Sequence, residues 1–132
     1  MTILSLHFND THIRIALRRS ATAQAVLNAI PFSATVQTWG QEVLFDCPIR
    51  VSFDDTATNI VKPGDIGFWP DGSAITIAYG ATPISRYGEA RLACSCNIWA
   101  DALDDVSALQ DIRPGTEVSV DIWHAANLEQ AS

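Results

Sequence analysis

Aromatic side chains with polar tips lie in the middle of this sequence, where they could build a ligand groove. Trp39, Trp69 and Tyr79 each combine a large apolar body with one hydrogen-bonding group. Such side chains often line sites for small molecules or peptides. Polar groups that could orient a ligand follow Tyr79 closely: Thr82, Ser85 and Arg86. The pattern therefore predicts a binding groove beside residues 64–85.

Phe68 and Trp69 are neighbours in a predicted strand, so their side chains must point to opposite faces. At most one of them can lie in a given pocket. We expect Phe68 in the core and Trp69 in the groove, because the tryptophan ring carries a polar N–H that the phenylalanine ring lacks.

Residues that bind metals or act as nucleophiles are present, but their spacing does not form a recognised centre. His7 and His12 could face each other across a hairpin, yet two histidines without a third ligand make a poor metal site. Cys94 and Cys96 share one strand face and lack the redox spacing of two intervening residues. No phosphate-binding loop, nucleophile elbow or zinc-protease motif is present. The sequence predicts no metal, no cofactor and no catalytic residue.

Charge and cysteine content limit the partners and the compartment. The 132 residues carry a formal net charge of −7, which opposes binding to nucleic acid or to an anionic membrane. No stretch approaches the roughly 20 apolar residues that span a bilayer. Met1–Phe8 lacks the basic start of a signal peptide, and the three cysteines are an odd number. We expect a cytoplasmic protein with reduced, buried thiols, including Cys47.

Short strands supply most of the predicted elements. Apolar residues alternate over residues 4–8 and 13–17, 32–39 and 42–47, 49–53, 65–69 and 74–79, 92–99 and 118–122. Two short helices are predicted over 23–30 and 103–109, with Ser20 or Thr22 capping the first. Without a linker the whole chain, residues 1–132, reads as a single domain. About eight short strands indicate a mainly β barrel or sandwich.

Several segments, taken in order, resemble the cyclophilin-like family of small bacterial and archaeal proteins. They are Pro31-Phe32, Thr38-Trp39-Gly40-Gln41-Glu42-Val43, Gly64-Asp65-Ile66-Gly67-Phe68-Trp69-Pro70, Tyr79-Gly80-Ala81-Thr82-Pro83-Ile84-Ser85 and residues 103–120. The resemblance implies a closed eight-stranded β-barrel capped by two short helices. It implies no particular activity, because the family has no settled one.

Three functions stay open at this stage. The first is a non-enzymatic binding module for a small molecule or short peptide. The second is a peptidyl-prolyl isomerase or another groove-based enzyme, for which Arg50 is the available stand-in for the arginine of true cyclophilins. The residues around Arg50 do not reproduce the Phe-His-Arg pattern of those enzymes. The third is a structural or oligomer-forming protein. The sequence favours the binding module and leaves the ligand and the oligomeric state open.

Overall fold

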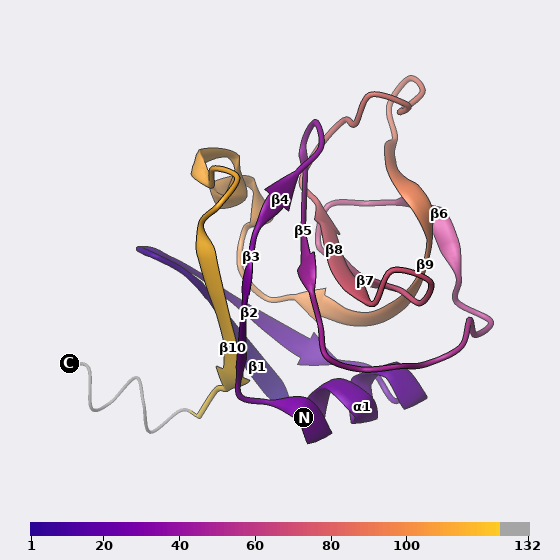
Figure 1. The fold of residues 1–132 in the computed structure, drawn as a ribbon. Coiled ribbons are helices and arrows are strands. Elements are labelled where there is room, and N and C mark those ends of the chain that lie inside the picture. The colour runs from indigo at the N-terminus through magenta and orange to yellow at the C-terminus, as the bar shows by residue number, and fades with distance from the viewer. Residues whose placement is uncertain (125–132) are drawn as a thin grey trace.

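The alternating apolar residues build a nearly closed antiparallel barrel in the computed structural model, which describes residues 1–124 (Figure 1). The helices are α1 (Ala21–Ala29) and the short 3-10 helix η1 (Val106–Asp111). The strands are β1 (Ile3–Phe8), β2 (Thr11–Leu17), β3 (Phe32–Thr35), β4 (Gln37–Thr38), β5 (Glu42–Asp46), β6 (Thr58–Val61), β7 (Asp65–Trp69), β8 (Ala74–Ala78), β9 (Ala90–Ala102) and β10 (Glu117–Ile122). None of the helices in residues 1–124 is long and apolar enough to cross a membrane.

The barrel wall runs in the order β3-β10-β1-β2-β9-β7-β8-β5-β4, and β6 pairs with β9 beside this path. The two edge strands, β3 and β4, are consecutive in the chain and are separated by Val36 alone. Val36 instead exchanges backbone hydrogen bonds with Thr116 and Gly115, each 2.8 Å long. One stretch of chain therefore brings both edges of the sheet together and nearly closes the barrel.

The expected count of eight strands was too low, since ten strands lie within residues 1–124. The stretch expected as one strand over 32–39 is interrupted at Val36, and Thr58–Val61 adds a short strand that was read as a lead-in to the central hairpin. The mainly β barrel with two short helices is confirmed. So are the opening hairpin, the central hairpin and the capping of α1 by Ser20, whose Oγ accepts a hydrogen bond from the N–H of Ala23.

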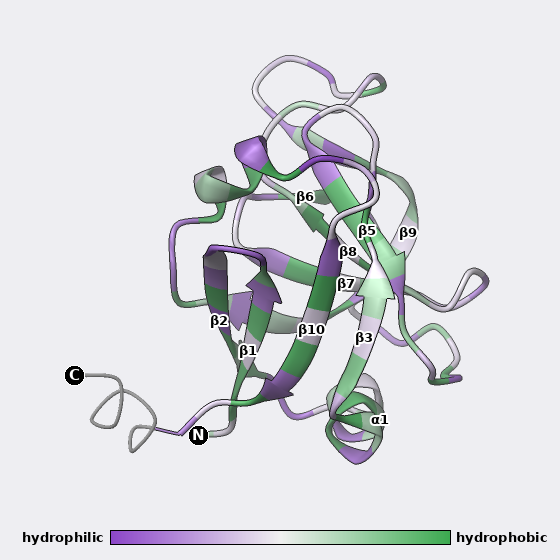
Figure 2. Ribbon diagram, turned by 60° about the vertical axis from the view of Figure 1, so that its left-hand side comes forward, coloured by the Kyte–Doolittle hydropathy of each residue, from purple (hydrophilic) through white to green (hydrophobic). Residues whose placement is uncertain are grey.

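The barrel interior holds the larger apolar core. Side chains that alternate along the strands fill it, and Figure 2 shows this alternation clearly along β10. Its largest fully buried members include Trp99, Phe8, Phe45 and Phe68. Helix α1 packs against the same core through Ala23 and Val26.

A second, smaller apolar cluster lies outside the barrel. β9 pairs through Asn97–Asp101 with β7, while its earlier half, from Ala90 to Cys96, pairs with β6. This earlier half covers part of the outer face of β8, where Thr76 and Ala78 are buried. The outer cluster consists of Val61, Ala78, Ala90, Leu92, Cys96 and Ile98, with Trp69 packed against them. The molecule is therefore two layers thick here.

Two expected elements differ in the structure. Residues 49–53 were expected to continue a strand, but residues 48–57 form no strand. The amide of buried Asn97 fixes this segment instead, since it accepts from the N–H of Asp54 and donates to the carbonyl of Ser52. The helix expected over 103–109 lies at Val106–Asp111 and is a 3-10 helix. Asp105 caps it by accepting a hydrogen bond from the N–H of Ser107.

Candidate functional site

A cavity of about 90 Å³ lies between the outer face of the barrel and the covering half of β9. β5 contributes Glu42 and Leu44, β7 contributes Trp69, and β8 contributes Thr76. β9 completes the wall with Leu92, Ala93, Cys94 and Cys96. The cavity is therefore built by strands that are distant in sequence and meet only in the folded barrel.

Strand alternation explains why Glu42 faces this cavity. Val43 and Phe45 belong to the barrel core, so Glu42 and Leu44 must point to the outer face of β5. Burial on this face decreases along β5, from buried Glu42 through partly buried Leu44 to exposed Asp46. The position of Glu42 in the strand therefore places its carboxyl group in an apolar space.

Glu42 is the chemically distinctive residue of the cavity. Its side chain is 2% exposed, and its Oε1 atom has no hydrogen-bond partner among residues 1–124. Burial raises the pKa of this carboxyl to about 7, an effect that the backbone N–H of Ala93 opposes by favouring the ionised form. Glu42 therefore exchanges its proton near neutral pH, and one of its oxygens is free to accept a donor.

The floor of the cavity is tightly packed. Thr76 donates a hydrogen bond from Oγ1 to the Sγ of Cys96, at 3.4 Å. A Cβ added to Gly67 would lie 2.6 Å from that same Oγ1 and 3.0 Å from the Cβ of Cys96. Glycine at position 67 is therefore what lets β9 approach the sheet closely enough to form this floor.

Trp69 lines the cavity, as the alternation predicted, and its indole packs over Gly72 in the hairpin turn. Its neighbour Phe68 points the other way and is completely buried in the barrel core, which confirms its expected position. Tyr79, the expected partner of Trp69, packs against the barrel core instead of the outer cluster. The structure therefore does not bring Trp69 and Tyr79 into one groove.

Trp39 lies at the turn between β4 and β5 and is half-buried. It is not part of the cavity wall, but its backbone pairs with that of Glu42, with N–H to O distances of 3.0 and 3.2 Å. The adjoining Gln41 binds the loop after β8, since its side-chain oxygen accepts from the N–H of Ala81. Gly40 has a φ of +58°, and a Cβ there would meet Pro83 at 2.7 Å. Residues of two segments that resemble the cyclophilin-like family thus hold the turn between β4 and β5 against the loop after β8.

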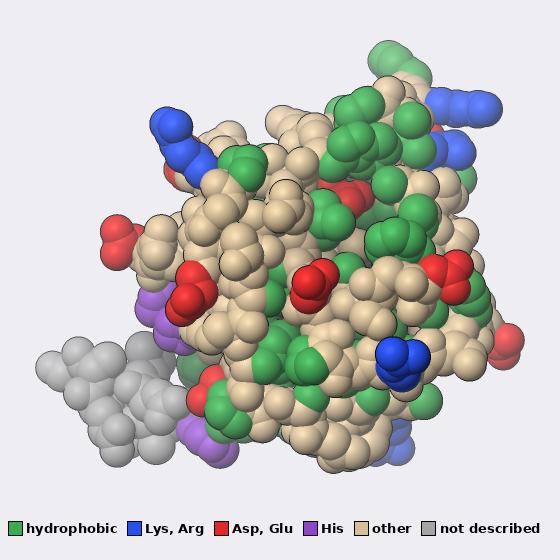
Figure 3. Space-filling model, viewed as in Figure 1, with side chains coloured by type: hydrophobic (Ala, Val, Ile, Leu, Met, Phe, Trp, Pro, Cys, Tyr) green, Lys and Arg blue, Asp and Glu red, His purple; other side chains and the backbone are tan. Residues whose placement is uncertain are grey.

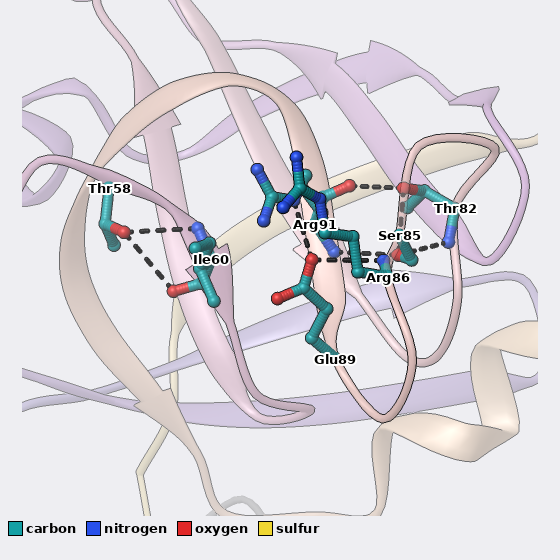
Figure 4. Close-up of polar contacts among 7 residues, drawn as sticks. All are labelled: Thr58, Ile60, Thr82, Ser85, Arg86, Glu89 and Arg91. Atoms are coloured by element: carbon teal, nitrogen blue, oxygen red, sulfur yellow. Dashed lines mark hydrogen bonds and ion pairs between the residues drawn. The ribbon is translucent and has the colours of Figure 1, made fainter.

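Thr82 and Ser85 fasten the loop between β8 and β9 (Figure 4). The Oγ of Ser85 accepts from the N–H groups of Thr82 and Arg91, both at 2.9 Å. Thr82 donates its hydroxyl hydrogen to the carbonyl of Arg91, so Ser85 must donate to the Oγ1 of Thr82. Both hydroxyl hydrogens are thus used within the loop.

Arg86 and Arg50, the two cations expected at the groove, are both exposed. The backbone N–H of Arg86 donates to Glu89, which also accepts from the Nε of Arg91 at 2.7 Å. Arg50 lies in the segment without a strand, and neither arginine lines the cavity.

Figure 3 shows apolar side chains on the surface around the loop between β8 and β9, which carries exposed Ile84 and Tyr87.

A larger hollow of about 410 Å³ lies beside the start of α1 and includes Arg18 and Ser20. Arg18 is already paired with Asp101, at 2.7 Å, and lies 3.9 Å from Asp65. Among residues 1–124, no side-chain nitrogen or oxygen atom that lines this hollow is both buried and without a hydrogen-bond partner. The smaller cavity at Glu42 is therefore the stronger candidate site.

Groups that could hold a metal ion are absent from residues 1–124, where no cluster brings together three or more His, Cys, Asp or Glu side chains. The rings of His7 and His12 do face each other, with centroids 4.0 Å apart, as expected for the opening hairpin. Glu42, Cys94 and Cys96 line one cavity without forming a metal-binding cluster.

We expect the three thiols to react at different rates. Cys47 and Cys96 are buried, and burial raises the pKa of each to about 12, so little thiolate forms at neutral pH. Cys94 is partly exposed and should react first, whereas the sequence led us to expect three buried and mostly unreactive thiols. Titration with a thiol reagent should label one cysteine in the native protein and three after unfolding. Rapid native labelling of all three would contradict this.

Sequence reasoning missed Glu42, which it placed in a strand without assigning it a role. The available signal was a carboxylate at the start of an apolar strand, at a position that alternation assigns to the outer face. That signal identifies an exposed residue in most barrels, because outer faces meet solvent. Only the crossing of β9 over this face turns Glu42 into a buried group.

The comparisons with known proteins agree with this architecture. A family model described as "Cyclophilin-like" matches residues 2–121. The solution structure of the hypothetical protein AF2241 from Archaeoglobus fulgidus is 26% identical, with a TM-score of 0.77 over 91% of this chain and 93% of that one. McbB, solved in complex with tryptophan, is 11% identical, with a TM-score of 0.62 over 89% of this chain and 43% of that one. No curated protein matches the sequence.

Proposed function

This chain belongs to the cyclophilin-like family, and on that premise we propose that it is a non-enzymatic binding module for a small molecule. The ligand occupies the cavity beside the β7–β8 hairpin, between Glu42, Trp69 and the covering half of β9. The volume of about 90 Å³ favours a small molecule over a short peptide.

The unpartnered Oε1 of Glu42 carries this proposal. A buried polar atom without a partner costs about 1–3 kcal/mol, so it needs either a ligand or a water to complete it. Glu42 lines a cavity with mostly apolar walls, which is the usual composition of a small-molecule site. McbB, which shares the fold, binds tryptophan, and this supports a small-molecule role for the fold.

We assign different roles to the residues that the sequence singled out. Trp69 contacts the ligand directly. Trp39, Tyr79, Thr82 and Ser85 support the loops around the site, while Arg50 and Arg86 remain in solvent.

A protein-observed NMR screen of small fragments tests the site. We expect fragment hits to shift the signals of the Ala93 amide and the Trp69 indole. Trp69→Ala should lower the affinity of these hits about tenfold or more, as loss of an aromatic contact can. Tyr79→Ala is the matched control, because Tyr79 packs on the opposite face of the sheet and should leave binding nearly unchanged. Hits that move only signals beside α1 would overturn the proposal.

Peptidyl-prolyl isomerase activity is the less favoured alternative. Arg50 is exposed in a segment without a strand and does not line the cavity with Trp69. We therefore expect no catalysis above background in a protease-coupled or exchange-NMR assay with X-Pro peptides. Clear activity that disappears in Arg50→Ala would favour the isomerase instead.

Another kind of enzyme is supported by the burial of Glu42 in this cavity, which raises the pKa of its carboxyl to about 7. A carboxyl that titrates near neutral pH inside an apolar cavity is suited to general acid–base catalysis. Turnover of a bound fragment that is lost in Glu42→Gln would identify such a reaction.

A further inference from the structure

We infer that the cavity is selective for a small primary ammonium ion, whose charged head pairs with Glu42 and whose short apolar tail packs against Trp69 and Leu92. This inference rests on the proposed function, because it names the ligand class of the same site. It follows from the charge, the polar groups and the size of the cavity.

The charge of the site favours a cation. Among the lining residues, all of which lie within residues 1–124, Glu42 is the single charged side chain. An isolated carboxylate in an apolar space is costly, and an ammonium group offsets that cost by supplying the opposite charge.

The hydrogen-bonding pattern favours a donor rather than an acceptor. The Oε1 of Glu42 has no partner in the described part of the chain, and Thr76 already donates its hydroxyl to Cys96. A ligand acceptor would therefore depend on Glu42 being protonated. An ammonium group brings up to three donors and satisfies the vacant oxygen directly.

The size of the cavity restricts the tail. A volume of about 90 Å³ corresponds to roughly three water molecules in the liquid, or about four non-hydrogen atoms. An amine as large as tryptophan exceeds this volume. A ligand this small binds weakly, with a dissociation constant on the order of a millimolar.

Binding of the ammonium ion must be coupled to ionisation of Glu42. The titratable groups that face Glu42 are the Cys94 and Cys96 thiols of β9, while β7 and β8 contribute Trp69 and Thr76, which do not titrate. Burial holds the pKa of Cys96 at about 12, so this thiol stays neutral near pH 7. Affinity should therefore rise with pH as Glu42 loses its proton.

The probes are n-propylammonium and its neutral counterpart 1-propanol, titrated at constant ionic strength and followed by the NMR shift of the Ala93 amide. We expect n-propylammonium to bind at least about fivefold tighter than the alcohol near pH 8, a modest gain typical of one charge-assisted hydrogen bond. Between about pH 8 and pH 6 its affinity should fall about tenfold, following the ionised fraction of a group with a pKa of about 7.

Three variants test whether Glu42 causes the preference for the ammonium ion and its pH dependence. Glu42→Gln keeps the size of the side chain and should abolish both the preference for the ammonium ion and the pH dependence. Asp46→Asn removes the same charge from an exposed position on the same strand and should change neither. Cys94→Ser should keep the pH dependence, since the inference assigns it to Glu42.

Two results would overturn the inference, and they are distinguishable. If 1-propanol binds as tightly as n-propylammonium and Glu42→Gln changes nothing, the cavity is a binding site but not one for ammonium ions. If neither probe shifts the Ala93 amide while other fragments bind elsewhere, the proposed site itself is wrong.

Discussion

Replacing Phe68 by alanine should lower the free energy of unfolding by about 3–5 kcal/mol, the usual cost of truncating a fully buried aromatic side chain. Phe68 is 0% exposed in the barrel core, opposite Ile75 on the neighbouring strand. The truncation removes apolar contacts and leaves a space that the surrounding strands cannot fill. Urea unfolding followed by far-ultraviolet circular dichroism measures the loss.

Trp69→Ala is the matched comparison, because it truncates the adjacent residue on the opposite face. Trp69 is only half-buried, so we expect a smaller loss of stability together with weaker ligand binding. Circular dichroism is preferable to fluorescence, since this variant removes a tryptophan. If Trp69→Ala unfolds the protein and Phe68→Ala does not, the assignment of the two faces is inverted.

Glu42 should make the protein less stable as the pH rises from about 4.5 to about 7. The carboxyl keeps its proton in the folded state up to a pKa of about 7, whereas in the unfolded chain it ionises near 4.5. Between these values the folded state binds more protons, so the free energy of unfolding falls with pH. The full difference is about 3 kcal/mol, and it is complete above the folded pKa.

Glu42→Gln isolates this contribution, because glutamine has nearly the same size and does not titrate. Chemical unfolding at about pH 4 and pH 8 should show a larger loss of stability with pH in the wild type than in the variant. The variant should be the more stable protein at the higher pH. Equal pH dependence in both proteins would show that Glu42 is not desolvated as described.

The assignment of single strand faces was predictable from the sequence. The alternation that places Phe68 in the core depends only on local geometry, which every strand shares. The hairpin register pairs Phe68 with Ile75 and Trp69 with Ala74. Once this register is known, Tyr79 must share a face with Ile75 rather than with Trp69, so the predicted groove of Trp69 and Tyr79 could not form.

The site itself was not predictable, because it depends on contacts between segments that are distant in sequence. Glu42 lines the cavity with Ala93, about fifty residues away, and nothing local indicates that β9 crosses over the outer face of the barrel. Thr82 and Ser85 were expected to bind a ligand because their side chains are polar. Their hydroxyl groups instead bond to one another and to Arg91, a pattern that spacing alone does not reveal.

The position of β10 has a consequence for how the protein is made. β10 pairs on one side with β1, where Leu4 faces Ile122, and on the other with β3, where Ala34 faces Val118. β1 and β3 are synthesised before β10, so the barrel wall cannot close until β10 has been made. Such non-local pairing slows folding to the range of about milliseconds to seconds. On the ribosome the early hairpin can form at once, but its apolar edge stays uncovered until translation has passed residue 122.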